Sequence, residues 1–157
     1  MGSVLDIAFR QGDLIVLLRL LIATLAGAAI GWNRFRAGKP AGVGTHALVA
    51  LGSALFVSIP IQMSPEHAND AFTRVVQGIA TGVGFLGAGE IFRDAGAGNR
   101  VHGLTSAAAL WVTAALGIVA GWGSGVLIAS ATAMVLLVIA LAPRLERRFP
   151  SKAREER

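Results

Sequence analysis

The chain has no cysteine, few charged residues and only three histidines. Without cysteine it can form neither a disulfide nor a zinc-thiolate site, and it has no thiol nucleophile. Charged residues make up 15% of the 157 residues, well below the share of about 25% that is usual in soluble domains. The hydrophobic fraction is 54% and the mean hydropathy is +0.65. These values indicate a single integral membrane domain.

Five apolar stretches approach the length of about 20 helical residues that a hydrocarbon core requires. We therefore predict an all-α protein with five transmembrane helices in a membrane domain of residues 1–143. The second stretch is short, and Pro60 near its end is expected to tilt or bend it. The last two stretches have almost no linker, which predicts a tight antiparallel hairpin. The predicted spans are residues 14–32, 47–63, 75–92, 104–121 and 123–142, followed by a basic tail at 144–157.

The basic residues are distributed unevenly between the two sides of these spans. Eleven of the fourteen lysines and arginines fall in the loops after the first and third spans and in the tail. The positive-inside rule then places the N-terminus outside and the C-terminus in the cytoplasm. The net charge of +5 is accordingly interpreted as contact with membrane lipids and not with nucleic acid. The first nine residues carry Asp6 and no early basic cluster, so a cleaved signal peptide is not expected.

The third predicted span contains five glycines and ends in a carboxylate, Glu90. Glycine costs a soluble helix about 1 kcal/mol relative to alanine, whereas small residues in a membrane helix allow close backbone approach. These glycines fall on two opposite faces, which predicts a crowded helix in the middle of the bundle. The glycines expected at helix contacts are Gly27, Gly31, Gly78, Gly82, Gly84, Gly87 and Gly89.

Polar side chains gather at the ends of the first three spans and at the start of the fourth, on the predicted cytoplasmic side. They form a candidate polar or ion site. The sequence signal for this site is weak, because no fixed ligand spacing links the residues. The connecting loop at residues 36–45 lacks the ordered GxxxxGK[ST] phosphate motif. No catalytic residue, resident metal or cofactor is predicted, and a bound cation is the one ligand considered. The candidate site residues are Asn33, Arg34, Thr45, His46, Glu90, Arg93, Asp94, Arg100 and Thr105.

Two interpretations of Glu90 remain open. It can be an interfacial carboxylate paired with Arg93 on the next turn, which is favoured, or a cation or proton site. For His46 and His102, a surface or capping role is favoured over metal binding. Thr105, with the serine that follows it, is expected to cap the fourth helix.

Arg19 lies about five residues inside the outer end of the first predicted span. The favoured interpretation is that its side chain snorkels outward to the interface. The alternative is that it pairs with a carboxylate in a water-filled vestibule.

From residue 19 to residue 141 the chain resembles the MgtC/SapB family of bacterial inner-membrane proteins. The resemblance rests on long ordered motifs: GAAIG at 27–31, GKPAG at 38–42, THALVALG at 45–52, GVGFLGAG at 82–89 and VHGLTSAAALWVTAALG at 101–117. The longer members of this family have a soluble C-terminal domain. We expect this chain to be a short form of the family without that domain.

This chain departs from the family pattern at several positions. Asn33 stands where the family usually has a glutamate, Gly44 where it has an arginine, and Glu90 where it has an aliphatic residue. One hypothesis is that Glu90 takes over the carboxylate role that Asn33 cannot play. The cysteine that some members carry on the fourth span is Val112 here, so no role of that thiol transfers.

What the resemblance implies is a non-enzymatic modulator of other membrane machinery in adaptation to low magnesium, acid or host stress, including virulence. The partners it implies are a second copy in a homodimer and a membrane protein such as the ATP synthase. The alternative function is a small transporter or channel for Mg²⁺, K⁺ or H⁺ that uses the polar site around Glu90. An enzyme is not expected, for want of catalytic geometry.

Overall fold

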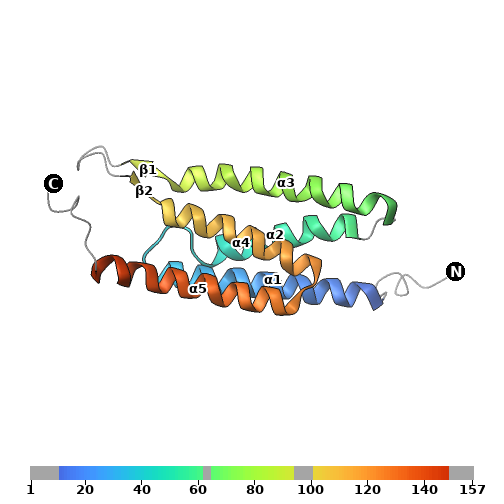
Figure 1. Cartoon of the computed structure of the whole chain (residues 1–157), viewed down its shortest axis with the longest axis horizontal. Coiled ribbons are helices and arrows are strands. Elements are labelled where there is room, and N and C mark those ends of the chain that lie inside the picture. The colour runs from blue at the N-terminus through green and yellow to red at the C-terminus, as the bar shows by residue number, and fades with distance from the viewer. Residues whose placement is uncertain (1–10, 62–64, 94–100, 149–157) are drawn as a thin grey trace.

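The computed structural model describes the backbone of residues 11–61, 65–93 and 101–148, and it is a bundle of five helices (Figure 1). A two-residue antiparallel ladder pairs β1 with β2, with Phe92 opposite His102. It joins the end of the third helix to the start of the fourth. The elements are α1 Gln11–Arg36, α2 Val43–Ile61, α3 Pro65–Glu90, β1 Phe92–Arg93, β2 Val101–His102, α4 Leu104–Trp122 and α5 Gly125–Arg148.

The expected all-α class is confirmed, and each predicted span corresponds to one helix. Four helices, α1, α2, α4 and α5, are long and apolar enough to cross a membrane. The helix α3 is longer than its predicted span, beginning at Pro65, and it is not among those four. That α3 crosses the bilayer therefore stays a prediction, as does the orientation of the termini.

The helices α1, α2 and α4 cross through small residues on each partner. A Cβ atom added at Gly27 of α1 would lie 2.5 Å from the backbone oxygen of His46 and 2.8 Å from Cβ of Ala50. On the other side of α2, a Cβ at Gly117 of α4 would collide with the backbone oxygen of Ala50. Because no side chain stands between them, these backbones pack in direct contact. Both Gly27 and Gly31 therefore lie at helix contacts.

The helix at the centre of the bundle is α4, which packs against all four other helices. Its ends are set by two glycines with positive φ, Gly103 at the N-cap and Gly123 at the C-cap. The N-cap makes no side-chain hydrogen bond, so the prediction that Thr105 and Ser106 cap this helix is wrong. Both residues lie inside the first turn. The hairpin to α5 is short: only Gly123 and Ser124 separate the two helices, and the Gly123 amide donates to the Val119 carbonyl.

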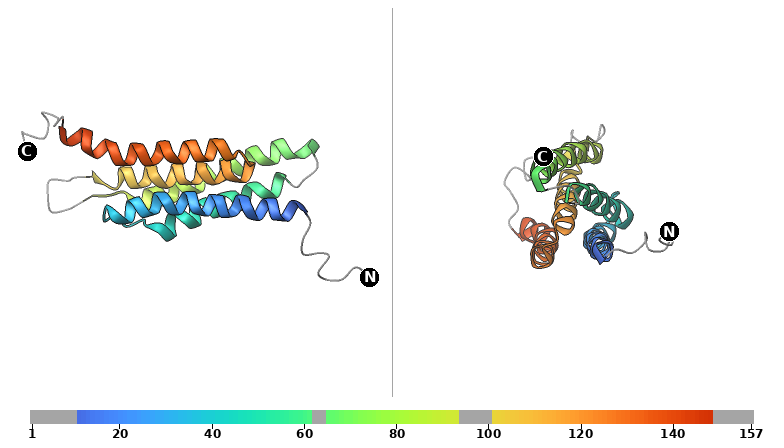
Figure 2. Two further views of the ribbon diagram at one scale, coloured as in Figure 1. Left: turned by 90° about the horizontal axis from the view of Figure 1, so that it is seen from below. Right: turned by 90° about the vertical axis from the view of Figure 1, so that its right-hand side faces the viewer.

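The prediction that the glycine-rich helix lies in the middle of the bundle is wrong for the single chain. The helix α3 lies at the periphery and packs against α4 and, less closely, α2 (Figures 1 and 2). Gly87 is in contact with Ala107 of α4. At the other four predicted contact positions of α3, an added Cβ would meet no atom of another described element within 4 Å: Gly78, Gly82, Gly84 and Gly89.

Candidate functional site

A cluster of four buried polar side chains joins α1, α2 and α4 toward the end of the bundle where α1 finishes. This polar cluster consists of Arg34, His46, Ser106 and Thr113, each at most 4% exposed. Arg34 stands in the last turn of α1, where the negative end of the helix dipole favours a cation. We call this end, which also carries the exposed Arg36 and the end of α5 at Arg148, the basic end.

His46 is bonded to α4 in a way that defines its tautomer. The Thr113 hydroxyl donates to the Ala109 carbonyl at 2.8 Å, so its single hydrogen is already used. The contact of 2.8 Å between His46 Nδ1 and Thr113 Oγ1 must therefore have Nδ1 as donor. The other ring nitrogen, Nε2, is then an acceptor, and among the described residues it has no hydrogen-bond partner. The favoured prediction of a surface or capping role for His46 is wrong, because its side chain is completely buried.

Arg34 ties α1 to α4 at the same level of the bundle. Its Nη2 donates to Ser106 Oγ at 2.8 Å, while its buried Nε has no partner within the described part of the chain. Within the described part of the chain this guanidinium makes no direct ion pair with the Glu90 carboxylate at the end of α3, whose charge acts on it only over a longer range. A charge this deeply buried needs polar partners. The cluster thus joins the three helices α1, α2 and α4 by hydrogen bonds, and Glu90 of α3 lies outside it.

Glu90 is held at a tight connection. Its side chain is partly buried, and a Cβ at Gly103 would collide with its carbonyl oxygen. Only glycine at position 103 allows the start of α4 to lie directly against the end of α3. The pairing of Glu90 with Arg93 stays a prediction, because the Arg93 side chain lies outside the described residues.

The described site residues Asn33, Thr45 and Thr105 form no hydrogen bond with the polar cluster. Thr45 and Thr105 are exposed, and Asn33 is partly buried next to Arg34 in the sequence. Asp94 and Arg100 lie outside the described residues. His102 is exposed on β2. Within the described ranges there is no group of three or more histidine, aspartate or glutamate side chains that could hold a metal ion.

The sequence interpretation missed the roles of Ser106 and Thr113. A signal for them was present: the two residues are seven apart, so on a helix of 3.6 residues per turn they share one face. A hydroxyl on the same stripe two turns apart in an otherwise apolar, alanine-rich helix points to polar partners on a neighbouring helix. Nothing in the sequence identified those partners as Arg34 and His46.

Arg19 marks a second polar contact, at the opposite end of the bundle. Its Nη1 donates to the Gly121 carbonyl at 3.0 Å, and its guanidinium lies against Gly123. The guanidinium therefore satisfies a carbonyl in the last turn of α4, where the helix dipole is negative. Among the described residues Arg19 forms no pair with a carboxylate, and its snorkelling to the interface stays a prediction.

Three grooves open on the surface of the bundle, with volumes of about 560, 350 and 290 Å³. All three border α3, and almost every residue that lines them is apolar. Magnesium prefers an octahedral set of oxygen ligands, which such surfaces do not supply. The polar cluster and the grooves are therefore separate features of the molecule.

The fold and the cluster define a class: multi-pass membrane proteins whose helices meet around buried polar side chains. Residues 20–148 match the model of the MgtC family, and the chain belongs to that family. The resemblance inferred from the motifs is thereby confirmed. No solved structure gives a significant match.

Three relatives illustrate the match. The chain is 50% identical to protein SrpB of Synechococcus elongatus, over 87% of this chain and 80% of the relative. It is 38% identical to YhiD of Escherichia coli K12, which is named as a candidate magnesium transporter, over 87% of this chain and 64% of the relative. It is 40% identical to protein MgtC of Salmonella typhimurium 14028s, over 76% of this chain and 49% of the relative. The match thus covers less than two thirds of the last two relatives.

Proposed function

We propose that this protein is a non-enzymatic modulator that acts by contact with other proteins in the bacterial inner membrane, in adaptation to low magnesium, acid or host stress. Membership of the MgtC family and the name of the Escherichia coli relative support the link to magnesium. The observation that carries the choice of modulator over transporter is the bonding of the polar cluster. Its side chains are used to join helices.

The bonding of the cluster favours a structural role for these groups. Arg34, His46 and Thr113 are each bonded to a protein group, and all are buried. A conduction path needs polar groups that can exchange water or protein partners for the ion as it passes. Groups committed to neighbouring helices instead fix the helix positions.

A large apolar face available to another protein supports the same proposal. Only 6% of the apolar stretch of α5 is buried against the rest of the chain, whereas half of the stretch of α4 is buried. Val126, Met134 and Val138 of α5 are each more than 60% exposed. We propose that this α5 face contacts a second copy in a homodimer or a larger membrane assembly such as the ATP synthase.

Cysteine crosslinking tests this proposal directly, because the chain has no native cysteine. Single Val126→Cys, Met134→Cys and Val138→Cys variants are expected to form disulfide-linked or maleimide-linked adducts in intact membranes. Leu48→Cys, on the exposed side of α2, serves as the matched control. Adducts identified by mass spectrometry should contain either two copies of the chain or the chain and one membrane protein. Equal adduct formation at all four positions, or none at any, would contradict a specific contact through α5.

The alternative function is a small carrier or channel for Mg²⁺, K⁺ or H⁺, supported by the partly buried Glu90 and its longer-range attraction to the buried Arg34. On this alternative, Glu90→Gln abolishes transport. The related hypothesis that Glu90 replaces a carboxylate at position 33 predicts that Glu90→Val combined with Asn33→Glu keeps growth in low magnesium. A double variant that fails while both single variants grow would exclude that exchange.

A further inference from the structure

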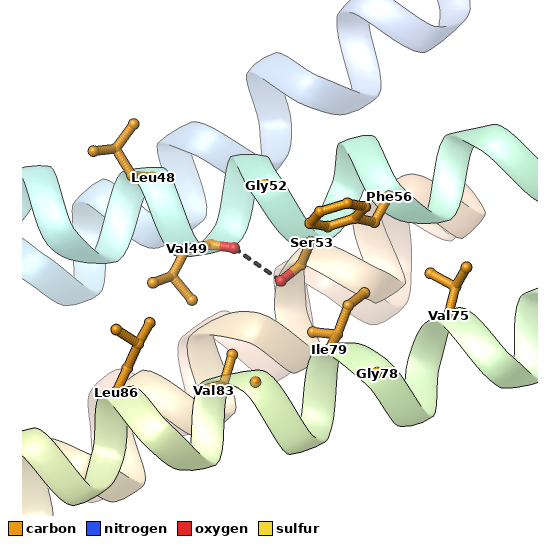
Figure 3. A pocket seen from close by; sticks show the side chains of 11 residues that line it. Leu48, Val49, Gly52, Ser53, Phe56, Val75, Gly78, Ile79, Val83 and Leu86 are labelled. Atoms are coloured by element: carbon orange, nitrogen blue, oxygen red, sulfur yellow. Dashed lines mark hydrogen bonds between the residues drawn. The ribbon is translucent and has the colours of Figure 1, made fainter.

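We infer that the groove between α2 and α3 binds one acyl chain of an anionic phospholipid, whose headgroup meets Lys39. The groove measures about 560 Å³, and the side chains of α2 and α3 face each other across it (Figure 3). This inference holds whether the protein modulates a partner or carries a cation, because it depends on a different part of the molecule.

The lining of the groove matches a hydrocarbon chain. Of the described residues that line it, Ser53 alone has a polar side chain, and its hydroxyl already donates to the Val49 carbonyl at 2.8 Å (Figure 3). Gly52 of α2 and Gly78 and Gly82 of α3 contribute no side chain, which leaves space between the two helices. An apolar space beside lipid loses dispersion contacts if it stays empty, so hydrocarbon fills it.

The dimensions favour a single chain over a helix. Between Leu48 and Phe56 the groove follows α2 for about 12 Å, and between Val75 and Leu86 it follows α3 for about 17 Å, at 1.5 Å per residue. This length is close to one leaflet of a hydrocarbon core about 30 Å thick. A helix about 10 Å wide and equally long would fill roughly 1,300 Å³, more than the empty space of about 1020 Å³ between these side chains, part of which is open to the surroundings.

The charge at one end of the groove matches a phospholipid headgroup. Ala41, in the connection between α1 and α2, packs in one apolar cluster with Val83 of the groove. Lys39 is two residues earlier, so its Cα lies within about 7 Å of that of Ala41, and its side chain is exposed. A lysine in this position attracts anionic lipid. Its phosphate would lie at the basic end while the acyl chain enters between α2 and α3.

Native mass spectrometry of the purified full-length protein, incubated with dioleoyl phosphatidylglycerol in mild detergent, tests this inference. The unmodified protein is expected to retain one lipid per protomer. A Gly78→Leu, Gly82→Leu double variant is expected to lose at least tenfold in retention, because two leucine side chains occupy the groove. An added Cβ at either glycine meets no atom of another described element within 4 Å, so each substitution begins in open space beside the groove. The matched control is Gly89→Leu, which also has open space but does not line the groove and should retain lipid normally.

A second variant tests the headgroup contact without changing the groove. Lys39→Gln is expected to reduce the preference for phosphatidylglycerol over phosphatidylcholine at least threefold, with acyl-chain retention preserved. Circular dichroism and gel filtration check that each variant is folded. Equal lipid retention in the double variant and in the Gly89→Leu control would overturn the inference. So would a protein dimer that the double variant loses in place of the lipid, because the occupant would then be a second copy.

Discussion

At the scale of single residues, the positive φ of 101° at Gly123 has an energetic consequence that a substitution can measure. Gly123→Ala is expected to destabilise the protein by about 1–3 kcal/mol, the cost of holding a non-glycine residue in the left-handed region. The new Cβ would also displace the Arg19 guanidinium and weaken its bond to Gly121. Unfolding in detergent, followed by circular dichroism, measures the change.

The control for this prediction is Gly44→Ala in the first turn of α2. An added Cβ at Gly44 meets nothing within 4 Å, so no loss of stability is expected there. If the two substitutions had equal effects, the backbone conformation at Gly123 would not be the cause.

We also predict the loss of stability that follows when the hydrogen bond between His46 and Thr113 is removed. Thr113→Val removes the acceptor of the buried His46 Nδ1–H, which should cost about 1–3 kcal/mol of unfolding free energy. His46→Phe combined with Thr113→Val removes both partners of the bond. The double variant should therefore lose less unfolding free energy than the two single variants lose in sum, by about 1 kcal/mol or more. Strictly additive losses in denaturant unfolding would show that the two side chains are not coupled.

At the scale of helices, two glycines in helix interiors differ in their surroundings, Gly117 of α4 and Gly82 of α3. Gly117→Ala places a Cβ against the backbone of α2 and should destabilise the protein by about 1–3 kcal/mol through overpacking. Gly82→Ala enters open space and should be neutral or stabilising by up to about 1 kcal/mol, since alanine favours helix. Thermal unfolding of both variants in the same detergent measures the difference. A larger loss at Gly82 would contradict the peripheral position of α3.

The positions of the helices could be predicted from the sequence, whereas the choice of which helices pack against each other could not. Lengths of apolar sequence locate helices such as α4 because the bilayer sets a minimum length. The glycines of α3 permit close contact on two faces, but they do not determine whether another helix fills the space. The burial of His46 could not be predicted, because its bond to Thr113 joins residues 67 apart in the sequence. Such pairings depend on how whole helices pack.

At the scale of the whole molecule, the distribution of basic residues predicts the orientation in the membrane. Arg36 ends α1, and Arg144 and Arg148 lie in the last turns of α5, at the same end of the bundle. The positive-inside rule places this end in the cytoplasm. A reporter enzyme fused after Arg157 should therefore be active only in the cytoplasm. Activity confined to the periplasm would reverse the orientation and place the polar cluster near the outer face.

The bonding of the polar cluster underlies our proposal that buried polar groups hold the bundle together and that the protein acts through contact with other proteins. Ion flux into liposomes that contain the purified protein tests this proposal. With Mg²⁺, K⁺ or H⁺ gradients and fluorescent indicators, the predicted result is a flux no greater than that of protein-free liposomes. A flux of any of these cations that Glu90→Gln abolishes would contradict the proposal.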